Sequence, residues 1–262
     1  MQMQQERRNW RFSGFSVFVT SVYLFLYIPV VILMLFSFNR GDSPTYWLGF
    51  TTHWYQEVFS SSEVYDALSN SLIVAFSSVF LTILLSTSYV FYGRLSGLYK
   101  VLPLFYLGLA VPEIVISVGL LSAFYVLSLP LGIMTLIVGH TLIGLGYVVP
   151  IIYARYNELD ERLLEASYDL GASRAQTFFY IVIPFLFPAL LSSALLVFII
   201  SFDDFVLSFF CAGPAAQTLP VYLFALIRSG ATPMVNVIST LMLVSSALFV
   251  GIFSWLQYGR QK

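Results

Sequence analysis

Long runs of residues without a charged side chain constrain this chain more than any other feature. Among the runs that contain no Asp, Glu, Lys or Arg are residues 12–39, 67–93, 131–154, 181–202 and 233–259. A helix rises about 1.5 Å per residue, so roughly 20 apolar residues cross the ~30 Å hydrocarbon core of a bilayer. A sixth run, residues 101–127, is interrupted only by Glu113. The sequence therefore predicts six membrane-spanning helices.

The composition agrees with an all-α membrane protein whose solvent is the lipid bilayer. Apolar residues make up 59% of the chain and charged residues only 10%, whereas soluble domains carry about 25% charged residues. A net charge of −1 gives no indication of nucleic-acid binding. Cys211 is the only cysteine, which excludes an internal disulfide and a cysteine-based metal site.

The distribution of basic residues predicts the orientation, because Lys and Arg near the ends of spans stay in the cytoplasm. Only Arg40 and Arg228 fall on the opposite side. We therefore expect both termini in the cytoplasm. The first span is too long for a signal peptide and lacks a small-x-small cleavage site, so we expect it to remain uncleaved. The other basic residues lie in the termini and in alternate loops: Arg7, Arg8, Arg11, Arg94, Lys100, Arg155, Arg162, Arg174, Arg260 and Lys262.

Residues 155–180 form a polar island between the fourth and fifth spans, and this orientation makes the island cytosolic. Asp160 is placed to cap a first short helix, because its carboxylate accepts the free amides of the first turn. Gly171 suits the left-handed position that ends a helix. Ser173 and Gln176 have the spacing of a capping box, which starts a second helix. We expect two helices joined by a glycine; an ordinary capped loop is the alternative.

The island resembles the EAA loop of type I ABC-importer permeases. The resemblance rests on Glu165-Ala166-Ser167, on a glycine six residues after the Glu, and on Ile181-Val182-Ile183-Pro184 beyond it. Two positions depart from the pattern, with Ser167 in place of the second Ala and Ile183 in place of a Leu. The resemblance implies a six-helix, MetI-like permease fold. It also implies that the loop docks on a cytosolic ATPase through Glu165, Ala166, Asp169, Gly171, Ala172 and Pro184.

Two prolines follow the island at the start of the fifth span. Pro184 and Pro188 each remove a backbone donor, which predicts a bend in the incoming helix. Such a bend suits a segment that transmits motion, although prolines are common in membrane helices in general.

Further segments resemble the permease subunits of ABC importers for spermidine and putrescine. This resemblance implies a multi-pass subunit of the bacterial inner membrane that carries a small cationic substrate. The implied partners are a second, homologous permease subunit, two cytosolic ABC ATPases and a periplasmic polyamine-binding protein. No cofactor is expected in this chain, since ATP and Mg would be bound by the ATPase subunits. The matching segments are Tyr27-Ile28-Pro29, Gly49-Phe50-Thr51-Thr52, Trp54-Tyr55, residues 201–220, Tyr222 and residues 233–236.

One departure from that family concerns the third span. This chain has Pro112-Glu113 where the resemblance implies a Pro-Asp pair. The additional methylene group of Glu113 alters the spacing to an amine, so the choice between spermidine and putrescine stays open.

Three acidic residues lie within or directly after spans, where a charge costs at least ~2.5 kcal/mol at mid-bilayer and persists mainly beside protein or water. Glu113 follows Pro112, which bends the third span, and Asp203 and Asp204 follow the fifth span. Carboxylates beside aromatic faces suit a permeant amine through charge pairing and cation–π contact. On a continuous helix, three further side chains share the face of Glu113 and complete the predicted substrate pathway: Tyr106, Ser117 and Phe124.

Each of these residues also has a purely structural interpretation. Glu113 would be neutral and hydrogen-bonded within the bundle, while Asp203 and Asp204 would cap helix ends in solvent. His140 lies in the fourth span without a visible partner, and the expected arrangement is a packed imidazole with one hydrogen bond.

Two segments between spans are expected at the membrane surface. Residues 205–230 are interrupted by two proline-containing pairs, Gly213-Pro214 and Leu219-Pro220. Thr218 is placed to cap a short helix whose residues 221–227 lie at the interface. Residues 52–59 contain several aromatic side chains, which prefer the headgroup level. We expect these residues to form a helix lying on the membrane.

The sequence contains no motif that would carry catalysis. It lacks the phosphate-binding Gly-x-x-x-x-Gly-Lys-Ser/Thr, His-Glu-x-x-His and Gly-x-Ser-x-Gly, so we expect a transport subunit and not an enzyme. We interpret residues 1–262 as one transmembrane permease domain of an ATP-driven importer that works by alternating access. The alternatives are a permease for another cation or organic solute, a secondary transporter or channel, and an intramembrane enzyme built on Glu113 and His140.

Overall fold

The computed structural model describes residues 14–41, 46–230 and 233–258. The described part is helical, and its only strand-like pairing is an isolated bridge between Asn39 and Phe50. Several basic residues that predict the orientation lie outside the described residues: Arg7, Arg8, Arg11, Arg260 and Lys262. The helices are α1 Gly14–Phe36, α2 His53–Ser60, α3 Ser62–Ser96, η1 Leu98–Val101, α4 Leu102–Ala110, α5 Glu113–Val126, α6 Ile133–Tyr156, α7 Glu161–Asp169, α8 Arg174–Thr177, η2 Phe178–Val182, α9 Ile183–Phe202, α10 Val206–Cys211, α11 Leu219–Ser229 and α12 Pro233–Tyr258.

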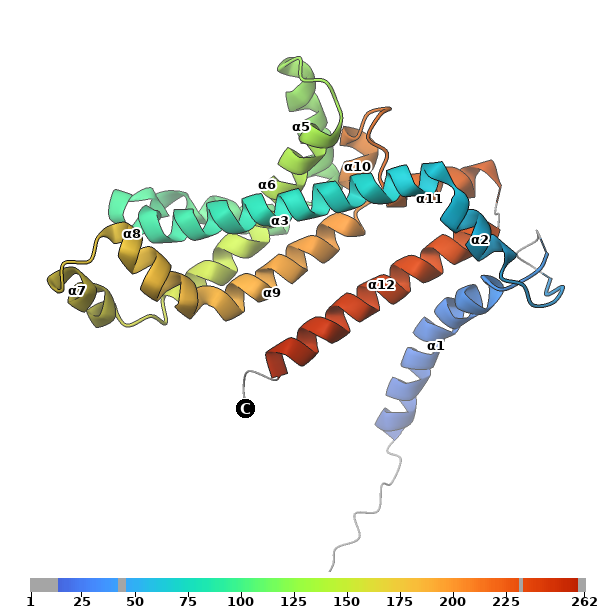
Figure 1. The fold of residues 1–262 in the computed structure, drawn as a ribbon, viewed down its shortest axis with the longest axis horizontal. Helices are drawn as coiled ribbons and strands as arrows, with labels where there is room; N and C mark the ends of the chain where they lie inside the picture. The colour runs from blue at the N-terminus through green and yellow to red at the C-terminus, as the bar shows by residue number, and fades with distance from the viewer. Residues whose placement is uncertain (1–13, 42–45, 231–232, 259–262) are drawn as a thin grey trace, which may run out of the picture.

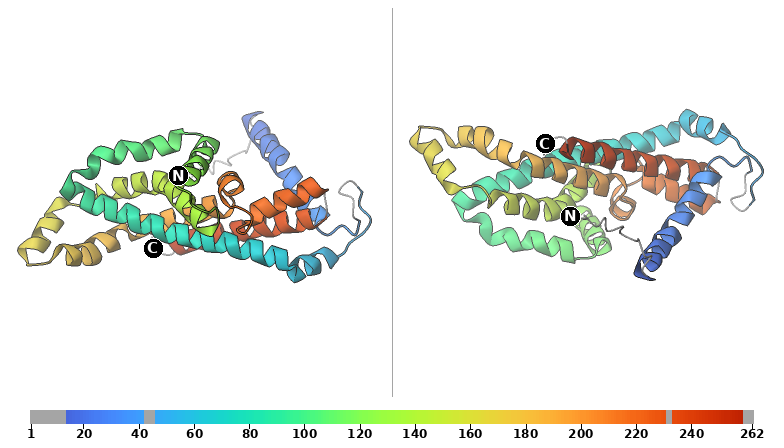
Figure 2. Two further views of the ribbon diagram at one scale, coloured as in Figure 1. Left: turned by 90° about the horizontal axis from the view of Figure 1, so that it is seen from above. Right: turned by 90° about the horizontal axis from the view of Figure 1, so that it is seen from below.

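These helices form an elongated bundle in which α3, α6, α9 and α12 run along the long axis (Figures 1 and 2). The helices α7 and α8 lie at one end, and α1, α2 and α11 lie toward the other. Between them, α3 packs on α6 and α9 around a core of buried side chains. In contrast, α1 contacts the rest of the described chain chiefly at α12 and contains no buried residue.

Five helices of the described chain are long and apolar enough to cross a membrane. They correspond to five of the predicted spans. Their bounds are Gly14–Phe36, Ser62–Gly93, Ile133–Tyr156, Arg174–Phe202 and Pro233–Gly251.

The remaining span, the third, is broken. Its two halves, Tyr99–Ala110 and Glu113–Val126, are apolar enough to cross together but meet at an angle of 114°. Val111 is extended (φ −81°, ψ 129°) and so is Pro112 (φ −56°, ψ 135°), because the proline ring disfavours a helical conformation at the residue before it. As a result α5 stands across the long axis of the bundle (Figure 1).

Hydroxyl groups and glycines bring α3 and α6 close together. Ser78 Oγ donates to the carbonyl of Ile137 at 3.4 Å, and Thr82 Oγ1 lies opposite Gly144, where an added Cβ would be 2.7 Å from that oxygen. Small residues and side-chain hydroxyl groups are the usual means of close helix packing in lipid, where no hydrophobic force drives helices together.

The connector between α9 and α12 contains two helices. The first, α10, packs against α5 and α6. Gly213 then turns the chain with a left-handed φ of +63°, and a Cβ at this position would lie 2.8 Å from the carbonyl oxygen of Leu131. The turn therefore requires glycine both for its backbone conformation and for space.

The second connector helix, α11, confirms the predicted short helix with Thr218 at its N-cap and Pro220 in its first turn. The expected side-chain cap is wrong, because the hydroxyl of Thr218 makes no cap hydrogen bond. Instead, Leu219 N donates to Ser71 Oγ of α3 at 2.8 Å. The start of α11 is thus fixed to α3.

The loop that connects α1 to α2 is organised by Asn39, which is 1% exposed. Its amide nitrogen donates to the carbonyl of Tyr46 at 2.7 Å, its side-chain oxygen accepts from Leu48 N at 2.8 Å, and its carbonyl accepts from Trp54 Nε1 at 3.0 Å. The helix expected over residues 52–59 is present as α2. Its placement on a membrane surface stays a prediction.

Candidate functional site

The polar island after α6 folds as predicted into two short helices joined by a glycine. Asp160 Oδ1 accepts from Arg162 N at 3.0 Å and so caps α7. Gly171 has a left-handed φ of +83°. Ser173 and Gln176 form the expected capping box at the start of α8, with Gln176 Oε1 accepting from Ser173 N at 2.7 Å. All three capping predictions are therefore confirmed.

A buried hydrogen bond fixes α7 against α8. The hydroxyl groups of Ser167 and Thr177 lie 2.9 Å apart, and both side chains are buried. Ser167 is one of the two residues that depart from the EAA pattern, and its hydroxyl group forms this hydrogen bond inside the loop. The start of the island is held as well, because Arg155 pairs with Glu158 and lies 4.3 Å from the centre of the Phe185 ring of α9.

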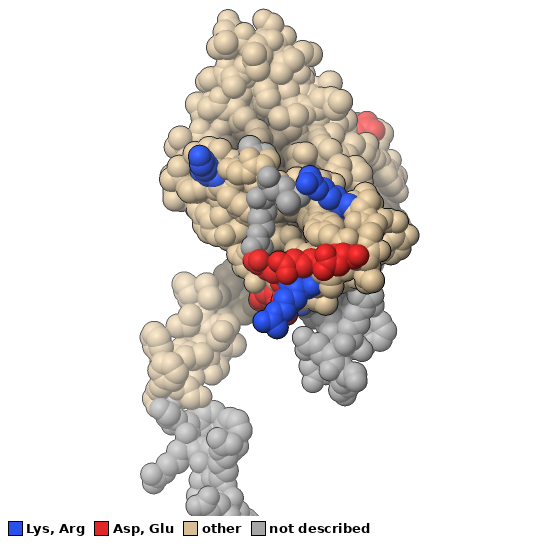
Figure 3. All heavy atoms as spheres, turned by 90° about the vertical axis from the view of Figure 1, so that its left-hand side faces the viewer, with Lys and Arg blue, Asp and Glu red and all other residues tan. Residues whose placement is uncertain are grey.

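The island presents a mixed apolar and charged surface at the end of the molecule. Leu170 is 89% exposed, and Leu163 and Tyr168 are exposed beside it. Figure 3 looks onto this end and shows acidic and basic side chains next to one another. The exposed charged residues of the island are Glu158, Asp160, Glu161, Arg162, Glu165, Asp169 and Arg174. The three apolar residues were missed by the sequence analysis, although their place on a short amphipathic helix is the signal that could have found them.

The predicted coupling residues occupy different positions on this surface. Glu165, Ala166, Asp169 and Gly171 are exposed on or directly after α7, and Ala172 is half-buried in the turn. Pro184 is exposed near the start of α9. In sequence order, these residues run from α7, through the turn after it, to the start of α9.

The helix that leads from the island into the membrane is irregular just before Pro184. Residues Phe178–Val182 form a π-helical turn, η2, which continues into α9. A proline cannot donate to the carbonyl four residues earlier, here that of Tyr180, and π-turns are a common way to accommodate such a break. A π-turn thus precedes Pro184, and the bend predicted at Pro184 and Pro188 stays a prediction.

A second cluster lies where α5, α6 and α10 meet, and Asp204 is at its centre. Asp204 Oδ1 accepts from Leu207 N at 3.3 Å and Oδ2 accepts from Ser208 N at 2.9 Å, so the carboxyl group caps α10. The structural alternative of a capping role is thus correct for Asp204, but its side chain is buried and not in solvent.

Two further ionisable side chains contact this carboxyl group. His140 Nε2 of α6 lies 3.7 Å from Asp204 Oδ2 and 3.4 Å from Ser208 Oγ. The carboxyl group of Glu113, from the first turn of α5, lies beside that of Asp204. Glu113 is exposed in the isolated chain, so the cluster opens to the surface at this residue.

The predicted packed imidazole with one hydrogen bond is confirmed, since His140 is buried and its hydrogen bond goes to Ser208, whereas its contact with Asp204 was not predicted. His140 and Asp204 are 64 positions apart in the sequence, and their approach depends on how α10 packs against α6. No local pattern indicates this contact. The position of Ser208, four residues after an acidic helix cap, is the only sequence signal for this part of the cluster.

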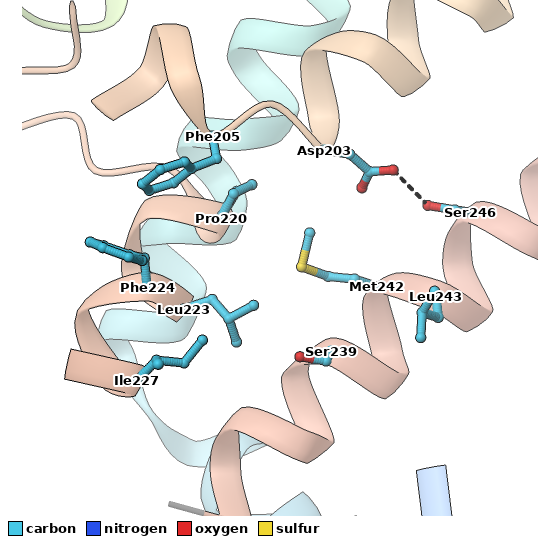
Figure 4. Close-up of a pocket in the computed structure, with 10 residues that line it drawn as sticks. All are labelled: Asp203, Phe205, Pro220, Leu223, Phe224, Ile227, Ser239, Met242, Leu243 and Ser246. Atoms are coloured by element: carbon cyan, nitrogen blue, oxygen red, sulfur yellow. Dashed lines mark hydrogen bonds between the residues drawn. The ribbon is translucent and has the colours of Figure 1, made fainter. Parts of the chain in front are cut away.

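Asp203 faces a different part of the molecule from its neighbour Asp204. Its Oδ2 lies 3.5 Å from Ser246 Oγ of α12, and Figure 4 shows its side chain directed toward that helix. It borders a cavity of about 410 Å³ between α11 and α12. Across the cavity the rings of Phe205 and Phe224 pack with their centres 4.8 Å apart. The two adjacent acidic residues thus serve two separate environments.

The other predicted pathway residues are not brought onto one face. Ser117 and Phe124 are buried where α5 packs on α10, and the carbonyl of Ser117 accepts from Cys211 Sγ at 3.8 Å. Tyr106 lies on α4, on the other side of the bend, and is 47% exposed. The shared helical face is wrong for Tyr106, because the chain turns by 114° between it and Glu113.

Neither site has the donor set of a metal centre. No group of three or more His, Cys, Asp or Glu side chains in the described part of the chain could hold a metal ion.

The comparisons with known proteins relate this chain to one family. A model of the family described as "Binding-protein-dependent transport system inner membrane component" matches residues 99–259. The spermidine/putrescine transport system permease protein PotC of Haemophilus influenzae is 36% identical over 243 residues, which cover 92% of this chain and 95% of that protein. The putrescine transport system permease protein PotI of Escherichia coli K12 is 32% identical and covers 95% of this chain and 90% of its own length.

A solved structure has a similar fold. In the crystal structure of a bacterial alginate ABC transporter in complex with an alginate pentasaccharide-bound periplasmic protein, one chain matches with a TM-score of 0.67 at 17% identity. The match covers 90% of each chain. At this identity the similarity concerns the fold alone.

Proposed function

The chain belongs to the family of binding-protein-dependent transport system inner membrane components, and from this premise we propose that it is the permease subunit of an ATP-driven importer of polyamines. Like these relatives, it is a transport subunit and not an enzyme. The observation that carries the proposed substrate is similarity over nearly the whole chain to permeases named for spermidine and putrescine. A permease for another cation or organic solute is the alternative.

The acidic residues supply a chemistry that fits this substrate. The position between the carboxyl groups of Glu113 and Asp204 is the one that a substrate ammonium group would take, because an ammonium group donates to both carboxylates and balances their charge. Asp203, Phe205 and Phe224 would receive a second ammonium group by charge pairing and cation–π contact. Ser117 and Phe124 would face the pathway from α5, and Tyr106 would face it from α4.

The island formed by α7 and α8 is proposed as the contact with the ATPase subunits. Glu165, Ala166, Asp169, Gly171 and Ala172 would lie in the contact, and Pro184 would transmit its movement into α9. ATP and Mg would be held by two partner ATPases, and this chain would bind no cofactor. Closure of the two ATPases would push α7. This movement would open the acidic cluster alternately to the two sides of the membrane.

The proposed topology places six spans in a bacterial inner membrane with both termini in the cytoplasm. The bent pair α4 and α5 would serve as the third span, and residues 1–262 would form one permease domain with its coupling loop at residues 155–180. A second, homologous permease subunit would complete the pathway. A periplasmic polyamine-binding protein would deliver the substrate at the end formed by α2 and α11.

Uptake into proteoliposomes tests this function. The chain is reconstituted with its permease partner, ATPases and binding protein, and radiolabelled spermidine and putrescine are supplied outside. We expect uptake that requires both internal ATP and binding protein. Uptake by this chain alone would indicate a channel or secondary carrier, and a complex with an active ATPase but no amine uptake would refute the proposed substrate.

Variants in the same assay test the two sites separately. Glu113→Gln and Asp203→Asn are expected to lower amine uptake, and Asp66→Asn, an exposed acid on α3, serves as their control. Glu165→Ala is expected to weaken ATPase docking. Normal uptake in both acidic variants would refute the acidic pathway, whereas normal docking and uptake in Glu165→Ala would refute only the coupling role of that residue.

A further inference from the structure

His140 is buried inside the fourth span at a contact that the proposed mechanism has not yet used. Its side chain is 1% exposed and that of Asp204 is 4% exposed. A polar ring at this depth is costly unless it is hydrogen-bonded. The groups within reach of its Nε2 atom are the carboxyl group of Asp204 and the hydroxyl group of Ser208.

The contact of His140 with Asp204 comes from a different helix than the hydrogen bonds that Asp204 accepts. Leu207 N and Ser208 N belong to α10, the short helix that Asp204 itself caps. Glu113 reaches Asp204 from α5, beyond the bend at Pro112. His140 alone among these partners comes from α6, the long helix with the largest buried share of the described spans. It therefore links the carboxyl group to the most deeply buried of the described spans.

The packing beside His140 fixes its reach. At the preceding residue, Gly139, an added Cβ would lie 2.8 Å from a methyl carbon of Leu207 in α10. The two helices therefore touch at the level of the imidazole. Thr135, one turn earlier, also crosses to α10 by donating to the carbonyl of Cys211 at 2.8 Å.

We propose that His140 is a positioning residue that holds the Asp204 carboxyl group in place when a substrate ammonium group separates it from Glu113. This rests on the proposed function, which makes that carboxyl pair an amine site. Without substrate, the carboxyl groups of Glu113 and Asp204 lie beside each other. With substrate between them, the imidazole and the two α10 amides are the contacts that keep Asp204 oriented, so His140 contributes to apparent substrate affinity and not to the rate of turnover.

Two substitutions in the reconstituted complex separate this role from packing. His140→Leu removes the polar contact with Asp204 and the hydrogen bond to Ser208, and we expect the KM for spermidine and putrescine to rise about tenfold, because a buried carboxyl group that loses a polar neighbour is held less firmly. We expect kcat and basal ATPase activity to stay unchanged. His140→Gln retains a side-chain donor and is expected to keep KM within about threefold of the unmodified chain.

A control and a double substitution complete the test. Thr135→Val removes the neighbouring bond between α6 and α10 without touching Asp204, so it should lower thermal stability and leave KM unchanged. His140→Leu should have no added effect on KM in an Asp204→Asn background. It should keep its tenfold effect in an Asp203→Asn background, since Asp203 faces α12.

The outcomes distinguish this proposal from the function on which it rests. Amine uptake by the unmodified complex with a normal KM in His140→Leu would overturn the role of His140 alone. An equal rise of KM in His140→Leu and His140→Gln, with the stability loss of Thr135→Val, would assign His140 to packing and also overturn it. No amine uptake by the unmodified complex would overturn the proposed substrate and this inference together.

Discussion

At the scale of single residues, the most informative pair is Asp203 and Asp204. The first ends α9 and faces Ser246, while the second caps α10 and is buried against His140. Neighbouring acidic residues at a junction between two helices can thus differ in burial, partners and role. Substitutions of the two residues are therefore expected to have different effects on stability.

We predict that Asp204→Asn destabilises the protein and that Asp203→Asn does not. An Asn side chain has one acceptor oxygen. One of the two backbone N–H groups that donate to Asp204 would therefore lose its acceptor, which lowers the free energy of unfolding by about 1–3 kcal/mol. Thermal unfolding of the purified chain in detergent measures the difference. Equal melting temperatures for the two variants would contradict the arrangement around α10.

Gly213 gives a second prediction at this scale. Gly213→Ala would place a Cβ 2.8 Å from the carbonyl oxygen of Leu131 in a left-handed turn, so the chain must shift, with a cost of about 1–3 kcal/mol. Gly119→Ala in α5 is the matched control, because its Cβ meets open space and Ala is the better helix former. A melting temperature that falls in both variants or in neither would count against this account.

The sequence predicts local features of the site better than distant ones. The caps of α7 and α8 depend on residues within four positions of one another, such as Asp160 with Arg162 and Ser173 with Gln176, so their spacing alone identifies them. The contact of His140 with Asp204 depends instead on the packing of α10 against α6. The predicted face shared by Tyr106 and Glu113 fails for the same reason, since the size of a proline bend is set by tertiary packing.

At the scale of elements, α7 is a short helix that is polar except for a few exposed apolar side chains. Helices this short are marginal in isolation, and α7 is held by the cap at Asp160 and by the buried bond between Ser167 and Thr177. The fixed orientation leaves Leu170 exposed at the tip of the island. An element of this kind has the form of a docking surface.

We therefore predict that Leu170→Ser weakens association with the ATPase subunits about tenfold or more. Burial of a Leu side chain in a partner contributes about 1.5–3 kcal/mol, and each 1.4 kcal/mol is a factor of about ten in affinity. Titration of the ATPase against the permease in detergent measures it. Leu170→Met keeps the apolar volume and should bind normally; if it weakens binding as much as Leu170→Ser, buried apolar area is not the cause.

At the scale of the whole molecule, the proposed topology places the α7 end in the cytoplasm and the loop before α2 on the other side. Cys211 is 0% exposed, so the chain carries no accessible thiol of its own in the described structure. Single cysteines can therefore be added at chosen exposed positions and labelled without removing the native one.

We predict opposite labelling of two such variants by a membrane-impermeant maleimide. Tyr46→Cys, at a position that is 71% exposed, should react in intact spheroplasts. Leu170→Cys should react only after the membrane is opened, and the unmodified chain should not react in either case. Labelling of Leu170→Cys in intact spheroplasts would reverse the topology.

The length of α3 has a geometric consequence for the whole molecule. Phe91, whose ring centre lies 4.9 Å from that of Phe178, and Ser71, which holds the start of α11, lie about 30 Å apart on this helix, and its 35 residues together extend over about 52 Å. One unbroken rod thus joins the π-turn to the opposite rim. A tilt of about 5° around one end would displace the other by about 4 Å over that length. Under the proposed mechanism, a small angular change at the end that contacts the ATPases would thereby be converted, without any flexible relay, into an opening comparable in width to a methylene chain.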